Sequence, residues 1–459
     1  MKTLTRRRFL KLATRAAAST SLSPLVFGSR AGAQVNLASD IGTGVDGDNL
    51  VIGMSGDFSS PRAGASIEYY RGSRAVLEEV NEQGGIHGKR LQLIALDDSG
   101  VPNVAISNTF RLLEVEQAFC LANYVGDETV ARVLPVVHTY RDANLRMVGN
   151  LSGALIQRRL PYVEQVYNVR ASTLQETAQL ANNSWDAGRR NIGLFYTADA
   201  GGRVGQAGVA RALAAKDATI TAEATHNAAL TDQAQGVIGR TGRADDQVSS
   251  QELAISALRD ETSAAVRYLR SNNCDSVICS TDPQTFQYFV AAARDSDWDV
   301  PIAGTSLSDS TPQDLIDLEN ARGVVAGLYT RAVYSSQVLP YFRNRNWPGV
   351  NLYHQLMTKW NPEAPTGSRA DYSPRLASSG LEGSINTRVL VAGLRLAGPE
   401  LSRPRFDQSL ASLAELDLGI NAPVSFADGD RQGLKQIYYT SIAGNSWEAL
   451  EGIVSALSS

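Results

Sequence analysis

The stretch Leu50–Asp98, which begins LVIGMSGDFSSP and ends NEQGGIHGKRLQLIALDD, decides the fold of this chain. Its first residues, Leu50–Met54, form a short apolar run of strand length that is followed by turn-forming residues. Apolar residues then recur at helical spacing, and Gly84-Gly85 supplies the left-handed backbone that ends such a helix. Leu91–Leu96 has the composition of a second buried strand. The stretch therefore predicts one strand-helix-strand unit.

The same alternation of strands and helices continues along most of the chain. It predicts an α/β fold whose parallel sheets are covered by helices on both faces. The chain is longer than a single ordinary core, so two Rossmann-like lobes are expected. We expect the polar segments 227–250 and 347–379 to be long surface excursions and 381–396 to be a helix. Further strand-like runs occur at 118–122, 145–148, 191–196, 219–225, 276–280 and 300–304.

The N-terminal region carries the pattern of an export signal. Thr5–Lys11 contains a twin-arginine motif, and the weakly apolar stretch Leu12–Phe27 leads to small residues at Ala31–Ala33. We therefore expect residues 1–33 to be a twin-arginine signal peptide that is cleaved near Ala33, and residues 34–47 to be a flexible lead-in. The later sequence has no apolar stretch long enough to span a bilayer. These features predict a periplasmic protein that meets the twin-arginine translocase during export.

The charge of the chain argues against nucleic acid as a partner. The full chain has a formal net charge of −4, and the expected signal holds seven basic residues and no acidic ones, so cleavage leaves about −11. A protein with this charge is repelled by a phosphate backbone, and nucleic-acid binding is therefore excluded as an expected function.

The sequence of Leu50–Asp98 resembles the N-terminal part of periplasmic solute-binding proteins of ABC transporters, of the branched-chain amino acid (Leu/Ile/Val-binding) type. Near the C-terminus, Val424–Asp430 and Gln436–Tyr439 are similar to the closing hairpin of that family. The resemblance implies the type I periplasmic binding protein fold, in which two lobes close on a small-molecule ligand. It also implies an ABC transporter permease in the inner membrane as partner. The implied boundaries are 48–168 and 332–415 for lobe 1, and 169–331 and 416–459 for lobe 2.

The resemblance places ligand contacts of lobe 1 at the carboxyl ends of strands, where open parallel sheets bind ligands. Asp127 and Thr129 lie in a segment similar to the loop that holds the ligand carboxylate, and Asp127 takes its serine-like position. Asn150, Leu151 and Ser152 lie in the next such loop, where a carbonyl and a hydroxyl would hold the amino group and carboxylate. Asp127 is also compatible with a helix N-cap, and Asn150 and Ser152 with a plain turn.

Lobe 2 departs further from the family pattern. Gly201 stands where the family has an aromatic residue, and Ser306 stands where amino-acid binders supply an acid for the ligand ammonium. Asp282 or Asp309 is a candidate to replace that acid, and each is also compatible with a helix N-cap. The expected ligand is therefore a small polar or carboxylate-bearing molecule, an amino acid or a related compound.

No pattern in the sequence indicates catalysis, a cofactor or a metal. The four histidines are scattered, and the chain has no His-x-x-x-His or Cys-x-x-Cys spacing. A phosphate-binding loop, a full dinucleotide fingerprint and a nucleophile elbow are absent as well. We therefore expect a binding protein rather than an enzyme. Two alternatives stay open at this point: a sensing protein that presents a bound metabolite to a separate receptor, and an exported enzyme.

Overall fold

The computed structural model describes residues 41–234, 244–307, 312–443, 446–450 and 452–458. Residues 37–459 form one compact unit. The expected signal peptide and its cleavage site lie outside the described residues. Residues 41–47 are the described part of the predicted lead-in, and they begin the ordered fold, because Ile41 is buried and Val45–Asp46 forms strand β1.

The first sheet is built from the stretch that decides the fold and from the strands that follow it. Its order is β1-β2-β4-β5-β6, with β3 on β2, and all pairs are parallel except that of β1 with β2. The strands are β2 (Asn49–Gly56), β3 (Arg90–Asp97), β4 (Cys120–Ala122), β5 (Met147–Val148) and β6 (Val166–Tyr167).

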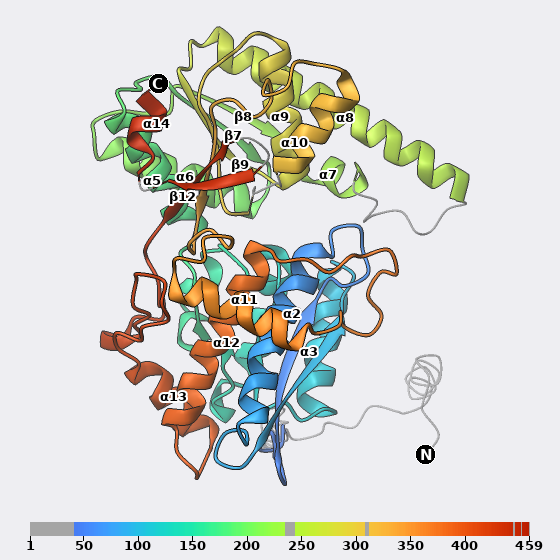
Figure 1. The fold of residues 1–459 in the computed structure, drawn as a ribbon, viewed down its shortest axis with the longest axis vertical. Helices are drawn as coiled ribbons and strands as arrows, with labels where there is room; N and C mark the ends of the chain where they lie inside the picture. The colour runs from blue at the N-terminus through green and yellow to red at the C-terminus, as the bar shows by residue number, and fades with distance from the viewer. Residues whose placement is uncertain (1–40, 235–243, 308–311, 444–445, 451, 459) are drawn as a thin grey trace, which may run out of the picture. The chain divides into compact units, whose positions relative to one another are not determined.

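Helices cover both faces of the first sheet because side chains of β2 alternate between two cores. Leu50 and Ile52 belong to a core with α2 (Gly64–Glu82), whereas Val51 belongs to a second core with α3 (Pro102–Glu114) and α4 (Asp127–Thr139). In Figure 1, α11 and α12 lie beside α2. The other elements around the first sheet are α11 (Pro348–Trp360), α12 (Ser378–Leu396), α13 (Arg403–Ser412), η1 (Arg141–Ala143), η2 (Ile156–Arg158), η3 (Val163–Gln165) and η4 (Ala427–Gly429).

The second sheet has the order β13-β12-β11-β10-β9-β7-β8. Its strands β8, β7, β9, β10 and β11 are mutually parallel, and the hairpin β12-β13 is added antiparallel at one edge. The strands are β7 (Ile192–Thr197), β8 (Ala222–His226), β9 (Ser276–Ser280), β10 (Ile302–Gly304), β11 (Val333–Gln337), β12 (Tyr438–Ala443) and β13 (Ser446–Leu450).

Helices also cover both faces of the second sheet. Leu194 of β7 packs into a core with α5 and α6, whereas Phe195 packs into a core with α8 and α9, where its ring stacks on Phe289 with centroids 4.6 Å apart. In Figure 1, α9 and α10 lie next to each other beside this sheet. The helices are α5 (Thr173–Asp186), α6 (Ala200–Ala214), α7 (Ala228–Ala234), α8 (Ala244–Ser271), α9 (Pro283–Asp295), α10 (Pro312–Arg322) and α14 (Val454–Ser458).

The predicted fold class is confirmed: two parallel sheets are each covered by helices on both faces. Two details differ from expectation. The segments 227–250 and 347–379 contain α7, the start of α8, and α11, and α11 packs through Val350, Tyr353, Leu356 and Met357. Strand β11 extends the second sheet, so the chain returns to the first sheet's helices only after Gln337. Among the described residues, no helix has the length and apolar content needed to cross a membrane.

Candidate functional site

A cleft of about 1680 Å³ lies where the carboxyl ends of strands from both sheets meet. Its walls include residues that follow β2, β4, β7, β9, β10 and β11, together with the first turns of α2, α4, α6 and α9. This is the position at which open parallel sheets present loops and free helix N–H groups to a ligand. The volume exceeds that of common small-molecule pockets, so the cleft has room for a small molecule together with water.

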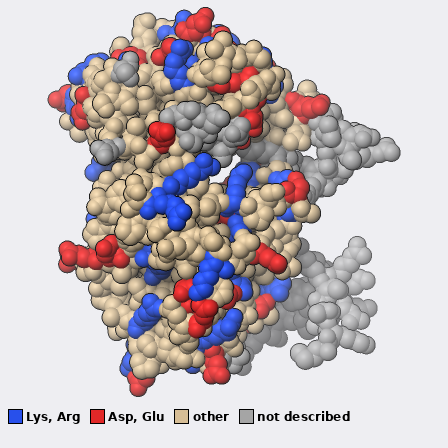
Figure 2. All heavy atoms as spheres, in the orientation of Figure 1, with Lys and Arg blue, Asp and Glu red and all other residues tan. Residues whose placement is uncertain are grey.

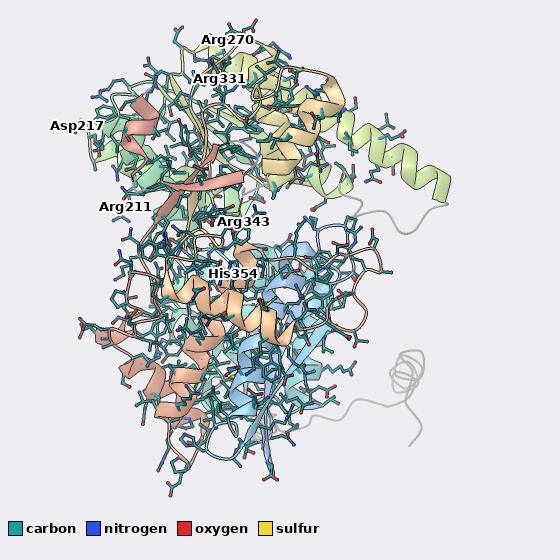
Figure 3. The ribbon with its side chains drawn as sticks, viewed as in Figure 1. Arg211, Asp217, Arg270, Arg331, Arg343 and His354 are labelled. Carbon is teal, nitrogen blue, oxygen red and sulfur yellow. The ribbon has the colours of Figure 1, made fainter. Side chains whose placement is uncertain are left out.

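One wall of the cleft is the segment 338–343, which leaves β11. His354 of α11 contacts the carbonyl oxygen of Phe342 through Nε2 at 2.8 Å, and the Arg343 guanidinium lies 5.4 Å from the Phe342 ring centroid. Arg343 and His354 are labelled in Figure 3, where they lie close to each other. The His354 contact attaches the wall to α11, so a helix beside the first sheet holds a segment that continues from the second.

Asp127, Thr129 and Leu151 line the cleft, and Asp127 is the first residue of α4. The Asp127 carboxylate accepts hydrogen bonds from Ser152 Oγ at 2.8 Å and from the backbone N–H of Gly153 at 2.9 Å. The carboxylate therefore joins the two loops that the sequence selected.

Asn150 and Ser152 lie beneath the cleft surface and do not line it. Both side chains are buried, at 2 % and 0 % exposure. The Asn150 amide donates to Gln157 Oε1 at 3.0 Å and accepts from the Tyr124 N–H at 3.3 Å. The structure thus gives them the turn-stabilising role that was the alternative to ligand contact, and Ser152 acts on the cleft through Asp127.

Gly201 lies in the first turn of α6 and faces Asp127. A Cβ at this position would be 3.4 Å from Asp127 Oδ2 and 3.5 Å from Asp199 Oδ1. Asp199 is the N-cap of α6, where its side chain accepts from the Gly202 N–H at 2.7 Å. Burial raises the pKa of Asp199, and the nearby Asp127 carboxylate raises it further. The glycine therefore leaves space between two carboxylates.

Asp282 and Ser306 also line the cleft, and both bond to neighbouring protein groups. Asp282 caps α9 by accepting from the N–H groups of Gln284 and Thr285, at 3.0 and 3.1 Å. Ser306 Oγ donates to Glu176 Oε1 at 2.9 Å, and its N–H donates to Glu176 Oε2 at 2.8 Å. The N-cap role of Asp282 is thereby present in the structure. Asp309 lies outside the described residues.

Sequence reasoning missed the charged groups at the floor of the cleft. Arg170 is 2 % exposed, and its guanidinium lies between Glu176 Oε1 at 3.3 Å and Glu382 Oε1 at 3.7 Å. The pattern around Glu382 contained a usable signal, because Glu382 shares a helical face with the apolar Ile385 and Val389 of α12. A carboxylate on a buried helical face marks a position that needs a partner.

Burial shifts the pKa values of Glu382 and Arg158 at the floor of the cleft, where both lie near Arg170. Burial raises the pKa of Glu382, and Arg170 opposes that rise. Burial, together with the neighbouring Arg170, lowers the pKa of Arg158 to about 9. Arg158 donates to the carbonyl oxygens of Ser152 and Ala154, at 3.2 and 2.6 Å. Two arginines and several carboxylates are therefore held together in a region from which water is largely excluded.

No group of three or more histidine, cysteine, aspartate or glutamate side chains is arranged to hold a metal ion within the described residues. On the face of the molecule drawn in Figure 2, acidic and basic side chains are interspersed. The cleft itself has an acidic balance, because nine carboxylates and four guanidinium groups line it.

Residues 49–238 match the model of a protein family described as periplasmic binding protein. An amino acid binding protein of Pseudomonas aeruginosa is 28 % identical over 97 residues, which are 21 % of this chain and 25 % of that relative. The chain thus matches about a quarter of the length of this curated relative.

Solved structures share the fold over nearly the whole chain. A possible leucine/isoleucine/valine-binding protein from Rhodopirellula baltica SH 1 superposes with a TM-score of 0.69 at 23 % identity, covering 88 % of this chain and 97 % of that one. A fatty acid ABC transporter substrate-binding protein from Thermomonospora curvata gives 0.67 at 17 % identity, covering 90 % and 93 %. Together these findings confirm the resemblance of this chain to the periplasmic binding proteins, and the chain has the type I periplasmic binding protein fold.

Proposed function

We propose that this chain is a periplasmic solute-binding protein that captures a small polar or carboxylate-bearing molecule, an amino acid or a related compound, by closure of two lobes. The observation that carries the proposal is the cleft between the carboxyl ends of two parallel sheets. Four residues that line it have buried side-chain atoms without a hydrogen-bond partner: Arg170, Thr173, Gln284 and Glu382. Buried polar atoms are normally satisfied, so unsatisfied ones in a cleft favour a site that a polar ligand completes.

The proposed binding residues are those that line the cleft among the sequence candidates: Asp127, Thr129, Leu151, Gly201, Asp282 and Ser306. Asn150 and Ser152 support them from below through hydrogen bonds. The structure adds Arg170 and Glu382 to this set. The proposed lobe boundaries are those implied by the resemblance, adjusted so that β11 belongs to the second lobe and residues 416–437, which pack in the core around α2, belong to the first.

In the proposed role the chain does not transform its ligand. Charged groups at the cleft are bonded to protein partners in ways that fix structure: Asp199 and Asp282 cap helices, and Glu176 accepts from Ser306. The acceptor of the captured solute would be an ABC transporter permease in the inner membrane, and the twin-arginine translocase would export the chain to the periplasm. The family match and the titles of the similar structures support this assignment.

A thermal-shift screen tests the proposal directly. The purified chain would be mixed with amino acids, amides, aromatic acids, fatty acids and nucleobases. A solute that binds only the folded state raises stability by about 2.7 kcal/mol at a hundred times its dissociation constant, which is a readily measured rise in melting temperature. Liquid chromatography of the mixture after incubation shows whether the solute is recovered unchanged. Turnover of the solute would contradict the binding function, and so would the absence of any stabilising compound.

A further inference from the structure

We propose that Glu382 is a specificity-determining residue of the cleft and that the solute bound there carries a cationic nitrogen which pairs with its carboxylate. This inference rests on the proposed solute-binding function. It assigns the acid for the ligand to helix α12 of the first lobe, at a position that no sequence pattern had selected. The argument has three independent parts: the unsatisfied oxygen of Glu382, the charge of the floor, and the charge of the cleft as a whole.

The first part is the hydrogen bonding of Glu382. Its side chain is 8 % exposed, and Oε1 has no hydrogen-bond partner among the described residues. The nearest cation, Arg170 Nη1, is 3.7 Å away, which is beyond a good hydrogen bond. By contrast, Glu176 accepts from the Ser306 N–H, from Ser306 Oγ and from Ser336 Oγ, at 2.8, 2.9 and 2.8 Å. Arg170 and Ser306 are therefore already engaged by Glu176, and Glu382 is the carboxylate that lacks donors.

The second part is the charge of the floor. Three carboxylates, those of Asp127, Glu176 and Glu382, lie close enough to interact electrostatically with Arg158 and Arg170. With all five groups ionised, one negative charge remains uncompensated. Arg158 contributes less than a full partner would, because its N–H groups are directed to backbone carbonyl oxygens. An uncompensated charge is costly in a buried position, and a cation delivered by the solute removes that cost.

The third part is the rest of the cleft. Carboxylates outnumber guanidinium groups along its walls, and one of the four arginines, Arg62, is paired with Asp232 at 2.9 Å. Asp127 and Asp199 face each other across Gly201 in the same cleft. A cleft of low dielectric constant with an excess of one sign of charge concentrates the field and attracts a ligand of opposite charge. A solute with only a carboxylate would meet the net negative charge of the cleft.

The apolar part of the wall limits the solute to an organic amine rather than an inorganic cation. Leu339, Tyr341 and Phe342 line the cleft beside Leu381, which precedes Glu382 on α12. A hydrocarbon or aromatic portion of the solute would cover these side chains while its nitrogen donates to Glu382 Oε1. The unsatisfied hydroxyl of Thr173 and Nε of Arg170 offer further hydrogen bonds to a polar group on the same solute.

The test uses a metabolite extract as the probe. The full mature chain is incubated with the extract and washed, and retained solutes are identified by mass spectrometry for the unaltered chain, for Glu382→Gln and for the control Glu363→Gln. Glu363 is a matched control, because it is an exposed glutamate that does not line the cleft. The recovered solute and its analogue without the nitrogen are then titrated by calorimetry.

The expected result is a retained solute with a cationic nitrogen, whose affinity falls at least tenfold in Glu382→Gln and changes less than threefold in Glu363→Gln. The analogue without the nitrogen should bind the unaltered chain at least tenfold more weakly, and this comparison does not depend on how the variants fold. A retained solute without a cationic nitrogen, or equal affinity of Glu382→Gln, overturns the inference and leaves the solute-binding function standing. If the unaltered chain retains nothing, the solute-binding function itself is overturned, and the inference with it.

Discussion

Asp98 is a buried carboxyl group that the fold stabilises in its protonated form. It is 1 % exposed, and burial raises its pKa from 3.8 to about 7 although Ser55 Oγ donates to it at 2.7 Å. A raised carboxyl pKa means that the folded chain retains a proton which the unfolded chain releases between pH 4 and pH 7. The contribution of Asp98 to stability is therefore most favourable below about pH 4 and is lost progressively as the pH rises to about 7.

We predict that Asp98→Asn raises the free energy of unfolding at pH 8 by roughly 2–4 kcal/mol, because the amide has no charge to bury. The difference should shrink towards zero below about pH 3, where Asp98 is protonated in both states. Urea unfolding at a series of pH values measures it, and Asp186→Asn on the exposed side of α5 is a control that should follow the unaltered chain. Parallel pH profiles for Asp98→Asn and the unaltered chain would contradict the assignment.

The sequence identified loops of the cleft more reliably than individual contacts. Asp127 and Ser306 were selected because their loops are similar to ligand-binding loops of the family, and both line the cleft. Asn150 and Ser152 were selected in the same way, yet they are buried, because the orientation of a turn side chain depends on partners such as Gln157. Glu382 comes from the first turns of a helix, and its proximity to Arg170 depends on packing that spans more than 200 residues.

Helices α2 and α12 pack so closely that glycine is required at their contact. A Cβ on Gly72 of α2 would fall well inside van der Waals contact with the carbonyl oxygen of Gly380 on α12. Both atoms belong to helix backbones, so a side chain cannot rotate away to relieve the overlap. The contact also positions α12, and with it Glu382, against the first sheet.

We predict that Gly72→Ala lowers the free energy of unfolding by about 1–3 kcal/mol or more, although alanine is otherwise the better helix former. Chemical denaturation followed by circular dichroism measures the change. Gly201→Ala is a matched control in another helix, where the nearest atom to the new Cβ is 3.4 Å away, and it should be neutral or slightly stabilising. Equal stability of Gly72→Ala and the unaltered chain would show that the two helices have room to separate.

Asp282 lines the cleft and is also the N-cap of α9, so its contribution to stability can be measured by substitution. We predict that Asp282→Ala lowers the free energy of unfolding by about 1 kcal/mol, because the N–H groups of Gln284 and Thr285 lose their acceptor, whereas Asp282→Asn retains most of it. Urea unfolding of both variants measures this. If Asn and Ala were equally destabilising, the charge of Asp282 rather than its capping geometry would be the important property.

The elements that the sequence predicted well were those with strong apolar periodicity. The strands of 50–54, 91–96 and 276–280 are present as β2, β3 and β9. Strands β2 and β9 are buried almost throughout, whereas β3 alternates between exposed and buried positions in its first half. Helices α7 and α11 were predicted as surface excursions. In α11 the buried Val350, Tyr353, Leu356 and Met357 recur at helical spacing, but the prolines of the segment favoured a loop. Helix α7 has seven residues and buries Thr231 and Ala234, so local pattern is a weak guide to it.

At the scale of the whole molecule, Arg62 and Asp232 connect the two sides of the cleft. Arg62 follows β2 of the first sheet, Asp232 belongs to α7 beside the second, and their side chains meet at 2.9 Å. Both line the cleft, and both are about a third exposed, at 37 % and 32 %. Solvent screens such a pair, so its effect on global stability is small, at about 0–1 kcal/mol. Its effect on the distance between the two sides is expected to be larger, because few other contacts restrain a hinge.

We predict that Arg62→Asp shifts the ligand-free chain towards a more open arrangement, because two carboxylates then face each other at the mouth of the cleft. Small-angle X-ray scattering should show a larger radius of gyration for Arg62→Asp, and the double variant Arg62→Asp with Asp232→Arg should restore the original value because it recreates the pair. Arg141→Asp is a control, since Arg141 is exposed in η1 and is absent from the cleft wall. A radius of gyration that is the same in all four chains would mean that the pair does not restrain the lobes, and that closure depends on the solute and on the floor around Arg170.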